Sequence, residues 1–68
     1  MLIKVNGEGR EFDDGLSLPA LVSLLNLKPE QIAIELNKSV VRRSEWAGVR
    51  LSEGDQVEIV HFVGGGAD

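Results

Sequence analysis

The 68-residue sequence contains no cysteine, a single histidine and no long apolar run. Without cysteine the chain cannot form a disulfide scaffold, a zinc–cysteine site or a thiol nucleophile, which fits a reducing compartment. No apolar stretch approaches the ~20 residues of a membrane span, and the apolar start at residues 1–5 turns polar too soon for a signal peptide. The sequence therefore predicts a cytoplasmic protein without a membrane partner.

Basic residues are also few. Seven Lys and Arg stand against eleven Asp and Glu, which gives a formal net charge of -4, and the only adjacent basic pair is Arg42-Arg43. Scattered basic residues in an acidic chain argue against nucleic-acid binding and favour a basic partner. We therefore expect no nucleic acid among the partners.

Catalytic and metal-binding patterns are missing as well. His61 has no acidic residue at a spacing that suggests a catalytic triad, and no Gly-x-x-x-x-Gly-Lys sequence is present. Glu11, Asp13 and Asp14 lack the alternating ligands of a calcium loop and are typical of a solvated turn. We expect a chain that is not an enzyme and that binds no cofactor or metal itself.

The first half of the chain predicts a hairpin followed by a helix. Residues 1–5 alternate like a half-buried strand, and Asn6-Gly7 is a strong hairpin signal, so residues 9–12 should return antiparallel, with a bulge at Gly9 left open. Ser17 is suited to cap a helix, with Pro19 in its first turn. Leu16 and Leu21 are spaced to form a hydrophobic staple at the start of this helix. Asn26 and Pro29 are its stop signals. Its buried stripe is formed by Leu18, Leu21, Val22 and Leu25.

The second half predicts two strands separated by a short irregular segment. The expected parts are a strand at 31–36, a turn at 37–39, a short edge segment at 40–41, one helical turn at 43–48 whose Trp46 covers an end of the core, a turn at 51–55 and a strand at 57–63. The fold class is α+β, a mixed four- to five-stranded sheet with one main helix packed on one face. If the first and last strands pair in parallel at the centre, the fold is a β-grasp, the ubiquitin-like roll, although periodicity alone does not give strand order.

The last strand and the glycines after it form the candidate functional region. If Val57 and Ile59 face the core, Val60 and Phe62 point outward, and exposed apolar neighbours mark an interaction surface. A bulge that buries Phe62 is the alternative. We expect a folded domain over residues 1–63 and a flexible glycine-rich tail over residues 64–68.

The glycines at 64–66 are too close to the end of the sequence to open a helix, so they do not form a phosphate loop. Because glycine lacks a Cβ atom, such a tail can thread a narrow channel into the active site of another protein. A carboxylate is a poor electrophile, so the partner must activate it, for example by adenylation with ATP. The chain would then be a substrate.

Several stretches of the chain together resemble the ThiS family of sulfur carriers over essentially its whole length. They are Ile-Lys-Val-Asn-Gly at 3–7, Ala-Ile-Glu-Leu-Asn at 33–37, Val-Val-Arg-Arg-Ser-Glu-Trp at 40–46, Leu-Ser-Glu-Gly-Asp at 51–55, Val-Glu-Ile-Val at 57–60 and Val-Gly-Gly-Gly at 63–66. A Gly-Asp turn before a Val/Ile strand also occurs in the small subunit of molybdopterin synthase. The Arg-Ser-Glu-Trp segment and the short length are more similar to ThiS.

The resemblance implies a β-grasp protein whose C-terminal glycine is adenylated by a ThiF-type enzyme that uses ATP and magnesium. Gly66 would bear the adenylate and then a thiocarboxylate, with Gly65 as its partner in the diglycine. Sulfur would arrive through a cysteine desulfurase route and pass to the thiazole being built on ThiG in thiamine biosynthesis. We expect a monomer that docks its partners through four residues, Val60, Phe62, Val63 and Gly64.

The sequence departs from the family pattern in two ways. Lys38 stands where members usually carry glycine after the asparagine of the middle turn, and Ala67 and Asp68 follow Gly66 although active carriers end at the second glycine. We therefore expect a processing protease to cleave after Gly66. The alternatives are a carrier for molybdopterin or cysteine synthesis, a ubiquitin-like protein modifier, and a plain β-grasp binding module.

Overall fold

The computed structural model describes residues 1–62 of the chain. Its elements follow one another in the order β1 (Leu2–Val5), β2 (Glu8–Glu11), α1 (Leu18–Leu24), the short 3₁₀ helix η1 (Pro29–Gln31), β3 (Ile32–Leu36), β4 (Ser39–Val41), the 3₁₀ helix η2 (Arg43–Gly48) and β5 (Gln56–His61). No helix in this part of the chain is long and apolar enough to cross a membrane.

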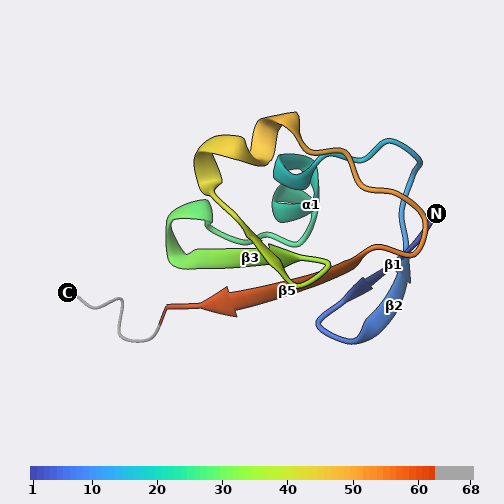
Figure 1. The fold of residues 1–68 in the computed structure, drawn as a ribbon, viewed down its shortest axis with the longest axis horizontal. Coiled ribbons are helices and arrows are strands. Elements are labelled where there is room, and N and C mark those ends of the chain that lie inside the picture. Colours follow the sequence, from blue (N-terminus) through green and yellow to red (C-terminus); the bar gives the residue numbers. More distant parts are fainter. Residues whose placement is uncertain (63–68) are drawn as a thin grey trace.

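The five strands form one mixed sheet in the order β2-β1-β5-β3-β4, with the last strand at its centre. β1 and β5 are parallel, with Val5 opposite Val57, whereas the other neighbouring strands are antiparallel. Helix α1 and the η2 segment lie on the same side of this sheet (Figure 1). The predicted α+β fold is confirmed, and so is the parallel pairing of first and last strands that defines a β-grasp.

The β1–β2 hairpin closes through a two-residue turn. Asn6 and Gly7 have φ angles of 50° and 85°, the left-handed values that such a turn requires. The register runs without a break from Val5 opposite Glu8 to Leu2 opposite Glu11. The returning strand therefore begins at Glu8, one residue earlier than predicted, and Gly9 forms no bulge.

Helix α1 begins and ends as its capping signals predict. The Ser17 hydroxyl accepts a hydrogen bond from the backbone N–H of Ala20 at 3.2 Å, and Pro19 occupies the first turn. This bond satisfies one of the N–H groups that a helix start leaves free. Asn26, at φ 58°, turns the chain away after the helix.

The core lies between the sheet and the layer formed by α1 and η2. Trp46 of η2 is buried, and its indole N–H donates to the backbone carbonyl of Val41 at 2.9 Å. This contact ties η2 to the β4 edge, so Trp46 closes one end of the core as predicted. The buried apolar residues are Ile3, Val5, Leu18, Leu21, Val22, Ile32, Ile34, Trp46, Leu51, Val57 and Ile59.

Candidate functional site

The central strand β5 presents two apolar side chains to solvent. Val57 and Ile59 face α1 and are 0% and 8% exposed, whereas Val60 and Phe62 are 55% and 56% exposed. Five consecutive residue pairs join β5 to β3, so no bulge interrupts the alternation between Leu36 and Ile32. The prediction that Val60 and Phe62 point outward is confirmed.

The backbone of Phe62 is fixed even though its ring is exposed. Its N–H donates to the carbonyl of Gln31 at 2.9 Å, one residue beyond the end of β5. The pairing with the β3 side of the sheet therefore continues through Phe62.

Further apolar side chains lie with Val60 on the sheet face opposite α1, which we call the open face. Ala33 lies directly opposite Val60 on β3, and Val40 of the edge strand is 69% exposed. We call Ala33, Val40, Val60 and Phe62 the docking face. An exposed apolar group of this kind is the usual mark of an interaction surface.

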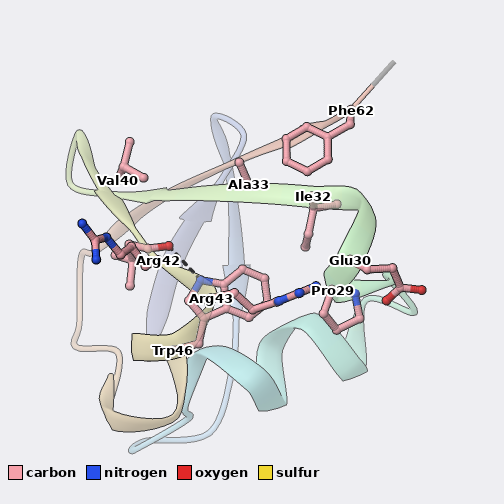
Figure 2. A pocket seen from close by; sticks show the side chains of 10 residues that line it. Pro29, Glu30, Ile32, Ala33, Val40, Arg42, Arg43, Trp46 and Phe62 are labelled. Carbon is pink, nitrogen blue, oxygen red and sulfur yellow. Dashed lines mark hydrogen bonds between the residues drawn. The ribbon is translucent and has the colours of Figure 1, made fainter. Parts of the chain in front are cut away.

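A hollow of about 280 Å³ borders the docking face at Phe62. Figure 2 shows its lining, which includes the apolar side chains of Ile32 and Phe62, the indole of Trp46 and the two adjacent arginines, Arg42 and Arg43. Ala33, Val40 and Phe62 of the docking face also line this hollow, so its apolar surface is continuous with that face, and Arg42 and Arg43 add two cationic side chains to its lining.

Asn6 holds the β1 side of β5. The backbone N–H of Asn6 donates to the Val57 carbonyl at 2.8 Å, which continues the parallel ladder. At φ 50° the chain then turns away, and the Asn6 side-chain Oδ1 accepts from the N–H of Ile59 at 2.7 Å. A side-chain oxygen thus replaces the backbone carbonyl where the ladder would otherwise stop.

Asn37 holds the other side of β5 in the same way. Its N–H donates to the Gln56 carbonyl at 2.7 Å, and its side-chain Oδ1 accepts from the Gln56 N–H at 2.9 Å. Its amide group also donates to the Asp55 carboxylate at 3.1 Å. The sequence showed both asparagines only as turn residues, and their role in positioning β5 was missed.

The residues considered for catalysis or metal binding are not brought together. His61 is exposed at the end of β5, opposite Ile32, and does not join Val57 and Ile59 in the core. Within residues 1–62, no group of three or more His, Cys, Asp or Glu side chains could hold a metal ion.

The acidic turn after β2 interacts with the start of the chain. Carboxylates of Glu11 and Asp14 lie 3.4 Å and 3.5 Å from the Met1 ammonium group. Desolvation would lower the pKa of this ammonium, but the two carboxylates outweigh it, and the pKa rises above its ordinary value of 8.0. Glu11 and Asp14 therefore interact with the Met1 ammonium group of the same chain.

Four of the predicted site residues, Val63, Gly64, Gly65 and Gly66, lie outside the described residues, as does the predicted boundary between residues 63 and 64. The described part of the site is thus the docking face and the backbone of β5 that leads toward these residues.

Comparison with known proteins gives a consistent result. The model of the ThiS family matches residues 3–66. The chain is 30% identical over 66 residues to the sulfur carrier protein ThiS of Bacillus subtilis, covering 96% of this chain and all of that protein. A crystal structure of the thiamine biosynthesis protein ThiS from Geobacter metallireducens superposes with a TM-score of 0.85 at 33% identity, covering 97% of this chain and all of that one.

Two longer proteins are also similar. A thiazole synthase of Magnetococcus marinus is 46% identical over 66 residues, and one of Paramagnetospirillum magneticum is 38% identical over 68 residues. The chain spans about a fifth of the length of these two relatives, 20% and 21% respectively, while 97% and 100% of the chain is matched. A segment similar to this chain is thus part of proteins named thiazole synthase.

Proposed function

Because this chain belongs to the ThiS family, we propose that it carries sulfur for thiazole formation in thiamine biosynthesis as a thiocarboxylate on Gly66. A carrier of this family is acted on by enzymes and is not itself an enzyme. The observation that supports the proposal is the match to the family model, which extends through Gly66. Two residues of the docking face, Val60 and Phe62, precede this glycine by a few positions in the sequence.

The chemistry requires the Gly66 carboxylate to become an electrophile. A ThiF-type enzyme, which binds ATP and magnesium itself, transfers AMP to the carboxylate and releases pyrophosphate. The outer sulfur of a persulfide formed by a cysteine desulfurase then attacks the carbonyl carbon and releases AMP, and a thiol reductant cleaves the resulting S–S bond to leave the thiocarboxylate. The thiocarboxylate passes its sulfur to a ThiG-type thiazole synthase, a step supported by the presence of similar segments in proteins named thiazole synthase.

Gly66 can react in this way only when its own carboxylate is free. Ala67 and Asp68 follow it in the sequence, so the proposal includes cleavage of the peptide bond between Gly66 and Ala67. Gly65 then precedes the reactive residue, and two consecutive residues without a Cβ atom lead the carboxylate into the partner's active site.

Intact-mass measurement of the protein isolated from its own cells tests this proposal. We expect a chain that ends at Gly66 and a fraction whose mass is higher by the difference between one sulfur and one oxygen atom. A chain that keeps Asp68 and accepts AMP there would contradict it. Species joined to target proteins through lysine would identify a ubiquitin-like modifier instead.

The docking face gives a second test. Phe62→Ala should raise the Kd for the ThiF-type enzyme by at least about fivefold, since loss of an aromatic anchor at an interface typically costs more than about 1 kcal/mol. Leu24→Ala is the matched control, because Leu24 is 62% exposed on α1, away from the open face. Equal affinities for the two variants would show that Phe62 does not dock the enzyme.

A further inference from the structure

We propose that Glu35 and Glu58 form an acidic part of the docking face and bind a lysine or arginine side chain of the adenylating partner. This inference rests on the proposed function, because it assumes that such a partner docks on the open face. It adds the chemistry by which that partner is recognised.

The two glutamates lie directly opposite each other in the sheet. The register of β3 against β5 pairs Glu35 with Glu58, next to the pair formed by Ala33 and Val60. In an antiparallel pair such residues project from the same face, with Cβ atoms about 4.5–5.5 Å apart. Like charges in this arrangement destabilise the sheet, so the pair is unfavourable in the free chain.

Within residues 1–62, the neighbouring cations form no salt bridge with this pair. Lys4 of β1 alternates with the core residues Ile3 and Val5, so it lies on the open face, and Arg42 directly follows the edge strand β4. Among residues 1–62, neither of them forms a salt bridge with Glu35 or Glu58, and the ion pairs found there involve only the Met1 ammonium group. The two glutamates are therefore available to pair with a cation that a partner supplies.

The charge pair is continuous with the apolar docking face. Glu58, Val60 and Phe62 follow one another at every second position, so adjacent members are roughly 6.5–7 Å apart along the open face. A lysine or arginine has an aliphatic stem that packs on apolar surface and a charged end. Its stem can cover Ala33 and Val60 while its cationic end lies between the two carboxylates.

An arginine suits the pair especially well, since its planar guanidinium has five donors and can bind carboxylate oxygens on two sides. The net charge of -4 adds a favourable long-range attraction toward a basic partner surface. The proposed occupant is thus a protein surface with an apolar residue that contacts Val60 or Phe62 and a cation beside it.

The test uses the full-length chain carrying Glu35→Gln, Glu58→Gln or both, with titration calorimetry against the ThiF-type enzyme at low and at raised salt. Glu45→Gln on η2 is the control, because it removes the same charge from the opposite side of the sheet. We expect the double variant to raise the Kd about tenfold at low salt and less at raised salt, since salt screens exposed charges. Its Tm without partner should rise by roughly 1–8 °C, because the repulsion is gone.

Each other outcome contradicts the inference in a distinct way. If the wild-type chain binds the enzyme and the double variant binds it with the same Kd, the acidic site is overturned and the proposed function is unaffected. An equal loss in Glu45→Gln would show that only the net charge matters. A magnesium-dependent Tm rise that the double variant lacks would assign the pair to a metal ion, and a wild-type chain that does not bind the enzyme would overturn the docking face together with this inference.

Discussion

Replacing Asn6 tests whether its side chain holds the central strand. Asn6→Gly removes the oxygen that accepts from the Ile59 N–H at 2.7 Å, but it keeps a residue that tolerates the observed φ of 50°. Asn6→Ala removes the same oxygen and also places a Cβ-bearing residue that disfavours this angle. Asn6→Asp keeps both the acceptor oxygen and the tolerance of a left-handed conformation.

The expected losses of stability follow from two costs, the loss of the hydrogen-bond acceptor and the strain of the left-handed backbone angle. Ile59 is 8% exposed, so its N–H has little access to water when the acceptor is lost, and an unsatisfied buried donor costs about 1–3 kcal/mol. A left-handed alanine costs roughly 1–2 kcal/mol more. We expect a loss of about 1–3 kcal/mol for Asn6→Gly, about 2–5 kcal/mol for Asn6→Ala and under about 1 kcal/mol for Asn6→Asp.

Urea unfolding followed by tryptophan fluorescence measures these differences, since Trp46 is buried in the core. A domain of this size has a total stability of only about 3–10 kcal/mol, so losses of this size are readily measured. The diagnostic result is the order of stability, with Asp above Gly and Gly above Ala. If Asn6→Gly were as stable as Asn6→Asp, the side-chain bond to Ile59 would contribute nothing, and the reasoning would be refuted.

Two further substitutions test local features. Lys38→Gly should raise the free energy of unfolding by about 0.5–1 kcal/mol, because Lys38 has a φ of 72° that glycine adopts without strain. A Tm that does not rise in thermal unfolding would contradict this. Trp46→Phe should lower the free energy of unfolding by about 1–3 kcal/mol through loss of buried area and of the bond to the Val41 carbonyl. Because this variant lacks the chain's single tryptophan, its urea unfolding is followed by circular dichroism, and an unchanged midpoint would show that this contact does not close the core.

Much of the fold could be predicted because its determinants are local. The Asn6-Gly7 turn, the Ser17 cap and the alternation of residues 57–62 each depend on neighbours within a few positions. The structure confirms all three. The family departure at Lys38 leaves the turn intact as well, since that residue adopts the left-handed angle that glycine would otherwise supply.

The features that the sequence did not reveal depend on register between distant segments. The bond from Ile59 to Asn6 joins residues 53 positions apart, and the opposition of Glu35 to Glu58 exists only in the β3–β5 register that the structure has. Alternation gives the face on which a side chain lies, but it does not give the residue opposite. Alternation places His61 on the same face as Val57 and Ile59, but it does not show where the helix layer stops covering the strand, and His61 is exposed.

These positions divide the sheet into parts with different roles. Asn6 holds β5 through a hydrogen bond at the edge of the strand. The side chains proposed for docking lie on the open face. There the exposed apolar groups add little to the stability of the free chain, and the Glu35–Glu58 pair lowers it. Substitutions of the two kinds should therefore separate. Changes at Asn6 lower stability and affect partner binding only through the fraction of folded chain, whereas changes on the open face weaken binding with stability unchanged or higher. A parallel fall of both quantities on the open face would mean that these residues are structural and that the partner docks elsewhere.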